Sequence, residues 1–70
     1  MTCYIFLRPD GVKEVFNFEK VCFLSSIGAD VECSKEEINQ LTLEDSTTYT
    51  FVGDATVKIK GQDIFYLEFI

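Results

Sequence analysis

The clearest pattern of apolar and polar positions lies in the last third of the chain. Positions 55, 57 and 59 are apolar and positions 56, 58 and 60 are polar, which is the two-residue period of a strand with one face in a core. Apolar runs on either side, residues 49–52 and 64–70, are separated from this strand by Gly53-Asp54 and by residues 60–63. Turn residues at these distances predict three consecutive antiparallel strands.

The length of the first of these turns decides which side chains share a face. A two-residue loop would place Phe51 opposite a polar residue and would mix the faces. A three-residue loop over residues 52–54 pairs Phe51 with Ala55 instead. It also pairs Tyr49 with Val57, so that apolar residues lie together. We therefore predict the three-residue loop, with the neighbouring lysines on the opposite face.

The last strand, residues 64–70, is apolar on both faces. One face carries Phe65, Leu67 and Phe69, and the other carries Ile64, Tyr66 and Ile70 together with Glu68. Strands of this kind are typical of central strands, of closed barrels and of subunit interfaces. Ile64, Tyr66 and Ile70 are therefore candidate interface residues for homo-oligomerisation.

The N-terminal part of the chain predicts a further hairpin. Residues 2–7 are rich in aromatic and β-branched residues, and residues 12–18 form the return strand. The Pro-Asp-Gly sequence at residues 9–11 supplies what a tight turn needs. A three-residue loop there pairs Tyr4 with Phe16 across the hairpin.

Two shorter apolar segments follow this hairpin. Residues 19–27 contain a run that a buried strand and a buried helix explain equally well. Its Val and Phe favour a strand, whereas Asn17 before it and Gly28 after it suit a helix. Residues 29–34 alternate between apolar and polar, which predicts a half-exposed strand near a sheet edge.

One short helix is predicted after these strands. Ser34 and Glu37 have the spacing of a capping box, in which each side chain bonds the backbone of the other residue. The helix should cover residues 35–41, with Ile38 and Leu41 as its buried stripe.

Together these elements predict an α+β fold dominated by antiparallel strands, in a single compact domain over residues 1–70. We expect a sheet of five to six strands with one short helix, partly closed into a small barrel, because closure would cover both faces of the apolar strands. An open sheet that dimerises is the alternative. Seventy residues form a marginal core, and seven Phe and three Tyr indicate either dense packing or apolar surface kept for a partner.

The sequence contains little that could carry catalysis. Histidine is absent, and the three cysteines, Cys3, Cys22 and Cys33, lack the spacing of a metal site. We expect buried thiols in a reducing compartment, and neither an enzyme nor a bound cofactor or metal. The first residues lack the basic start of a secretion signal, and no segment reaches the ~18 apolar residues of a membrane span. A soluble, cytoplasmic protein is therefore expected.

Acidic residues are concentrated in one stretch. Residues 30–45, the acidic segment, contain six acids against Lys35 alone, and so carry −5 of the net charge of −6. The six acids are Asp30, Glu32, Glu36, Glu37, Glu44 and Asp45. Such charge disfavours direct binding to nucleic acid or to a membrane, and it favours either solubility alone or a basic partner.

These patterns predict a small, non-enzymatic protein-binding module. Its acidic segment would occupy a basic, nucleic-acid-handling site on a partner protein, as a nucleic-acid mimic of the kind that phages encode as inhibitors. The alternative function is a structural subunit that assembles with its own copies. Lys58 and Lys60 could bind phosphates while Tyr49 and Phe51 stack on bases. The predicted register, however, places the lysines on the other face of the sheet from those aromatic rings.

Overall fold

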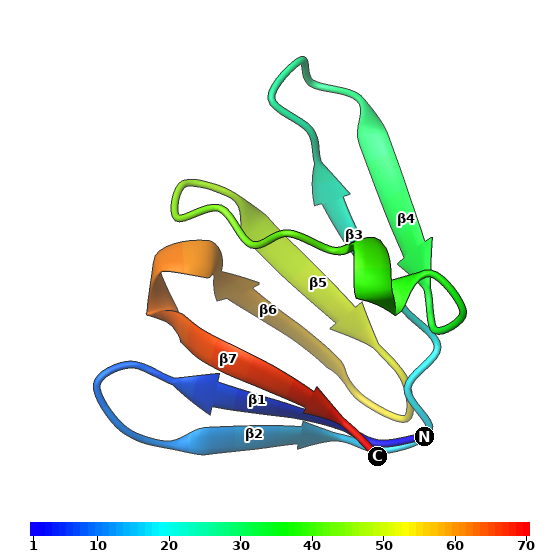
Figure 1. The fold of residues 1–70 in the computed structure, drawn as a ribbon, viewed down its shortest axis with the longest axis vertical. Coiled ribbons are helices and arrows are strands. Elements are labelled where there is room, and N and C mark those ends of the chain that lie inside the picture. Colours follow the sequence, from blue (N-terminus) through cyan, green and yellow to red (C-terminus); the bar gives the residue numbers. More distant parts are fainter.

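The computed structural model describes residues 1–70 and contains seven strands in two antiparallel sheets (Figure 1). The strands are β1 (Cys3–Leu7), β2 (Val12–Val15), β3 (Lys20–Leu24), β4 (Asp30–Ser34), β5 (Thr48–Val52), β6 (Thr56–Lys60) and β7 (Ile64–Phe69). The three-stranded sheet has the order β2-β1-β7, and the four-stranded sheet has the order β4-β3-β5-β6. The predicted antiparallel character is confirmed, but the single sheet of five to six strands and the closed barrel are wrong.

Both sheets contribute to one core. Nine buried residues form a single cluster that joins the two sheets. They are Cys3, Ile5, Val15, Phe18, Val21, Cys33, Tyr49, Phe51 and Ile64. Because two small sheets share this core, each needs cover on one face only, and a closed barrel is not required. Only three of the ten aromatic residues belong to the buried cluster, so most of the aromatic content lies nearer the surface.

The hairpin between β5 and β6 has the predicted faces but a different register. Tyr49 pairs with Ile59 and Phe51 pairs with Val57, which is a shift of two residues from the prediction. A shift of two leaves every side chain on its expected face, because the side-chain period of a strand is also two. The loop has three residues as predicted, but these are residues 53–55.

The first hairpin is shifted in the same way. Tyr4 pairs with Glu14 instead of Phe16, and β2 ends at Val15 instead of continuing to residue 18. Asn17 ends the extended backbone because its φ is +52°, a left-handed conformation that Asn tolerates better than most residues. Its side-chain amide donates a hydrogen bond to the Asp54 carboxylate at 2.9 Å, which connects this turn to the β5–β6 loop.

The segment left open between strand and helix is the strand β3, and the next segment is the edge strand β4. The predicted helix over residues 35–41 is wrong. Two single 3₁₀ turns occur in the chain, η1 (Ile38–Gln40) and η2 (Gly61–Asp63), and no helix has the length and apolar character that crossing a membrane requires. Asn39 and Thr42 are weak helix formers, and a helix this short does not recover its nucleation cost.

The last strand changes side at a β-bulge. Leu7 pairs with Ile64 and Phe6 pairs with Tyr66, so Phe65 is an extra residue on β7. Ile64 therefore points into the core and is 2% exposed, whereas Tyr66 points outward and is 43% exposed. The central strand of this sheet is β1, so β7 is an edge strand in spite of its two apolar faces.

We predict that Gly61→Ala destabilises the fold by about 1–3 kcal/mol. Gly61 is buried, and a Cβ there would collide with the backbone carbonyl of Glu44 and lie 3.1 Å from the Tyr49 ring. Urea unfolding measures the loss. The control is Gln62→Ala at the exposed neighbour, which should change stability by less than about 0.5 kcal/mol. Equal stability of the two variants would contradict this close packing.

Candidate functional site

The six acids of the acidic segment are all exposed and fall into three pairs. Asp30 and Glu32 alternate along β4, on the face opposite the buried Cys33. The second pair lies in the turn that precedes η1, and the third lies at the far end of the connecting segment, residues 35–47, which leads from β4 to β5 (green in Figure 1). The acids therefore line an extended path and do not converge on one point.

The turn before η1 forms half of the predicted capping box. The Glu37 carboxylate accepts hydrogen bonds from the Ser34 backbone N–H at 3.2 Å and from the Ser34 hydroxyl at 3.0 Å. The Glu37 N–H bonds to the Ser34 carbonyl, at 2.9 Å, instead of to the hydroxyl. Glu37 is thus occupied in holding the turn, while the carboxylate of Glu36 has no hydrogen-bond or ion-pair partner.

The other end of the connecting segment is fixed by Tyr49. The buried Tyr49 hydroxyl accepts a hydrogen bond from the Glu44 N–H at 2.8 Å and donates one to the Thr42 carbonyl at 3.2 Å. The Gln62 N–H of η2 donates to the Asp45 carbonyl at 3.0 Å. The backbone that carries Glu44 and Asp45 is therefore held against the core and against η2.

Charge on the acidic segment is almost entirely unneutralised. Lys20 and Glu32 form the one salt bridge of the structure, at 3.1 Å, and the hydrogen bond to Glu32 raises the pKa of Lys20. Both side chains are well exposed, so this pair contributes little to stability. The other five acids of the segment have no cation within ion-pairing distance.

The outward face of the four-stranded sheet is polar. Register places Glu32, Cys22, Thr50 and Lys58 in one row across β4, β3, β5 and β6. Glu32 thus lies on one edge strand of this face and Lys58 on the other, while Lys20 lies on β3 beside Glu32. The prediction that the β6 lysines and the β5 aromatic residues lie on different faces of the sheet is confirmed. Tyr49 and Phe51 are buried, so neither ring is available to stack on a base.

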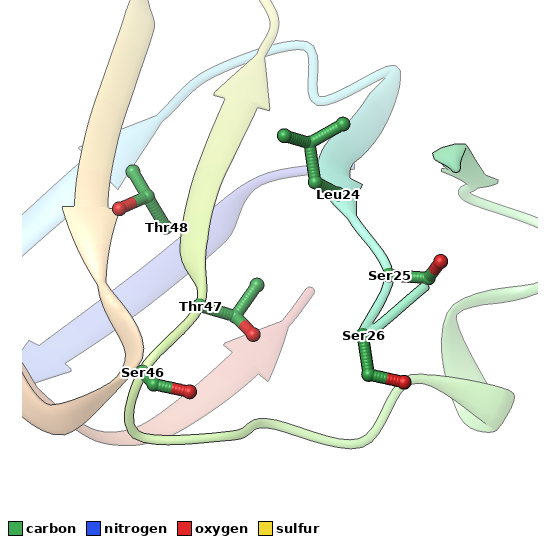
Figure 2. Close-up of a pocket in the computed structure, with 6 residues that line it drawn as sticks. All are labelled: Leu24, Ser25, Ser26, Ser46, Thr47 and Thr48. Atoms are coloured by element: carbon green, nitrogen blue, oxygen red, sulfur yellow. The ribbon is translucent and has the colours of Figure 1, made fainter. Parts of the chain in front are cut away.

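Two hollows on the surface were not foreseen from the sequence. The first is a pocket of about 380 Å³. Figure 2 shows the residues that line it, Leu24, Ser25, Ser26, Ser46, Thr47 and Thr48. It lies where β3 and β5 separate, because their pairing ends at Cys22 and Thr50 although both strands continue. The second is a largely apolar groove of about 450 Å³ between the connecting segment and β7. No charged residue lines either hollow.

Two of the three thiols, those of Cys3 and Cys33, are buried and poorly suited to nucleophilic chemistry. Burial raises the pKa of Cys3 to about 12, and burial together with the nearby Glu37 raises the pKa of Cys33. Cys33 lines a small hollow of about 200 Å³ beside Glu32 and Glu37, but a protonated thiol is a weak nucleophile. The structure contains no group of three His, Cys, Asp or Glu residues placed to hold a metal ion.

The predicted interface residues separate in the structure. Ile64 belongs to the core, whereas Tyr66 and Ile70 are 43% and 77% exposed on the outward face of the three-stranded sheet. The bulge at Phe65 separates them, and no signal in the sequence marks it. Comparison with known protein families, curated proteins and solved structures gave no match to this chain.

We predict that Tyr49→Phe costs about 1–3 kcal/mol of stability, because it leaves the Glu44 N–H and the Thr42 carbonyl without their partner. It should also speed amide hydrogen exchange at Glu44. The control is Tyr66→Phe, since the Tyr66 hydroxyl makes no hydrogen bond within the chain. Urea unfolding and exchange measured by NMR check both variants. Unchanged exchange at Glu44 would show that Tyr49 does not hold the connecting segment.

Proposed function

We propose that this chain is a non-enzymatic protein-binding module that docks its acidic segment on a basic surface of a partner protein. The observation that carries the proposal is the set of five exposed, unpaired acids on residues 30–45. A solubilising surface does not require fixed positions, but the Tyr49, Ser34 and η2 contacts hold much of this segment in place. Fixed charge of one sign favours fast and selective association with a surface of the opposite sign.

The partner surface is one that otherwise binds nucleic-acid phosphates. Clusters of Lys and Arg that bind phosphates supply the strongest positive fields on protein surfaces. The acids follow an extended path along β4 and the connecting segment. They would therefore complement an elongated basic groove on the partner better than one localised basic site. The chain would then act as a nucleic-acid mimic and an inhibitor, in the manner of small phage proteins.

A non-catalytic role agrees with the chemistry of the hollows. The two larger hollows lack ionisable side chains. The third is lined by Cys33, whose pKa is raised, and by two carboxylates that already have partners, Glu32 with Lys20 and Glu37 with Ser34. General acid–base or nucleophilic catalysis needs a group whose pKa lies near the working pH.

The test is charge reversal at three unpaired acids. The variant Glu36→Lys, Glu44→Lys, Asp45→Lys should lose the partner that the unaltered chain retains from a lysate of its native host, as measured by quantitative mass spectrometry. Capture by the unaltered chain should weaken steeply with added salt, because exposed charges are screened. Added duplex DNA should compete for the captured partner.

The matched control reverses three acids outside the segment, Asp10→Lys, Glu19→Lys and Asp63→Lys, all of which are exposed. It changes the net charge equally. Circular dichroism verifies that both variants are folded. Equal retention of the partner by the two variants would contradict a role of the acidic segment in binding. If added DNA does not reduce retention, the partner surface is not a nucleic-acid-binding site.

A second candidate is a structural subunit that assembles with its own copies, supported by the exposure of Tyr66 and Ile70. It predicts a mass above that of the monomer in sedimentation at high concentration, which Tyr66→Ser with Ile70→Ser would return to the monomer. A strict monomer at every concentration would exclude it.

A further inference from the structure

The outward face of the three-stranded sheet has an unusual composition. Pairing of β1 with β2 and with β7 places its outward residues in rows across the sheet (Figure 1). We call this surface the acidic-aromatic face, and it consists of Tyr4, Phe6, Val12, Glu14, Tyr66, Glu68 and Ile70. Ile70 belongs to it because its backbone exchanges two hydrogen bonds with Thr2, which extends the ladder by one pair.

The apolar part of this face is open to solvent. Val12 and Tyr66 are 48% and 43% exposed, and Ile70 is 77% exposed. Phe6 stacks face to face on Tyr66 with ring centroids 4.3 Å apart, so the two rings form one aromatic pair on this face. The opposite face of the same sheet is fully buried at Cys3, Ile5 and Val15. Contiguous apolar surface of this kind marks sites of interaction.

Two carboxylates interrupt the apolar surface in a defined way. Glu14 and Glu68 are the direct neighbours of Tyr4 on the two flanking strands. Strands lie about 4.8 Å apart, so the two acids stand about 10 Å apart with the Tyr4 ring between them. Neither forms a salt bridge. Arg8 lies over the Phe65 ring at 5.8 Å instead, and Lys13, the neighbour of Glu14 on β2, pairs with the buried Ile5 and so belongs to the other face of the sheet.

These carboxylates decide which occupant fits. A second copy packed face to face would bring four carboxylates into one interface with no cation, and like charges in an interface are strongly unfavourable. A purely apolar partner would strip water from both acids and leave them unpaired. A cation between Glu14 and Glu68 would pair with both and would also lie against the Tyr4 ring.

We propose that the acidic-aromatic face binds a segment of a partner protein in which an Arg or Lys side chain lies between two apolar side chains. The cation sits over Tyr4 between the two acids. One apolar side chain packs against the stacked Phe6–Tyr66 pair, and the other packs beside Ile70. These rows are spaced about 7 Å apart along the strands, which fixes the spacing of the three groups on the partner.

A displayed library of short random peptides tests this without knowledge of the partner. The peptide that selection enriches most is synthesised, its affinity is measured by calorimetry, and its site is mapped by NMR amide shifts. We expect a basic residue between two apolar residues, with shifts concentrated in β1, β2 and β7. Glu14→Gln with Glu68→Gln should weaken binding about tenfold, since each lost charge pair contributes about threefold.

The matched control is Glu19→Gln with Asp63→Asn. It removes two exposed carboxylates that lie outside the acidic-aromatic face and form no salt bridge. It should leave the affinity within about twofold, because distant exposed charges are screened. If the double variant on the face fails to fold, Glu68→Gln alone carries the test with about a threefold loss.

Several results would overturn the proposal: no enriched peptide, a purely apolar consensus, shifts outside this sheet, or equal loss in both variants. A dimer that buries this face would assign it to a second copy instead. Charge reversal in the acidic segment should not change peptide binding, because none of its six acids belongs to the three-stranded sheet. The two proposals can therefore fail independently.

Discussion

A single apolar layer between two small sheets is the constraint from which the rest of this structure follows. The layer contains nine buried residues, eight from strands of the two sheets and Phe18 from the link between β2 and β3. Burial of such side chains supplies most of the favourable free energy of folding. Sharing one layer means that each sheet has one face in the core and one face in water. The two outward faces meet this requirement differently: that of the four-stranded sheet is polar, whereas that of the three-stranded sheet remains aromatic.

Tyr49 connects this core to the acidic surface. Its ring is part of the buried cluster and packs near the Phe23 ring, with centroids 5.1 Å apart, while its hydroxyl bonds the backbone at Thr42 and Glu44. A phenol serves both purposes because its body is apolar and its tip is a hydrogen-bonding group. On the η2 side, Gly61 lies close to the Glu44 backbone and to the Tyr49 ring. The position of the backbone at Thr42 and Glu44 is thus determined by core packing.

Local alternation was enough to predict which residues face the core, but not how strands pair. The apolar sides of β4, β5 and β6 agree with the sequence pattern, because a register shift of two residues leaves each side chain on the same face. The capping box at Ser34 predicted a helix because the motif is local, whereas the backbone after it is set by Ile38 and Leu41 reaching the core. The β7 bulge depends on how β1 meets β7 across most of the chain, so no local signal could reveal it.

The same two-residue shift explains why the acidic-aromatic face could not be read from the sequence. With Tyr4 paired to Phe16, that row would be aromatic and would suit an apolar partner or a second copy. With Tyr4 paired to Glu14 and Glu68, the row is acidic, and the preferred occupant carries a cation. A register shift of two residues leaves each side chain on its face of the sheet but changes its neighbours on the adjacent strand. Those neighbours determine which chemical groups the surface can bind.

The two acidic surfaces also differ in what their charge can do. The acids of residues 30–45 are exposed on loops and an edge strand, so their field extends into solvent, speeds association and is weakened by salt. Glu14 and Glu68 stand among apolar side chains, and an occupant would exclude water around them. Their interaction with a cation would then strengthen and become less sensitive to salt, because screening acts mainly on charges that remain in solvent. If both proposals hold, charge on the first surface would affect the rate of encounter, and charge on the second would affect the selectivity and the lifetime of the complex.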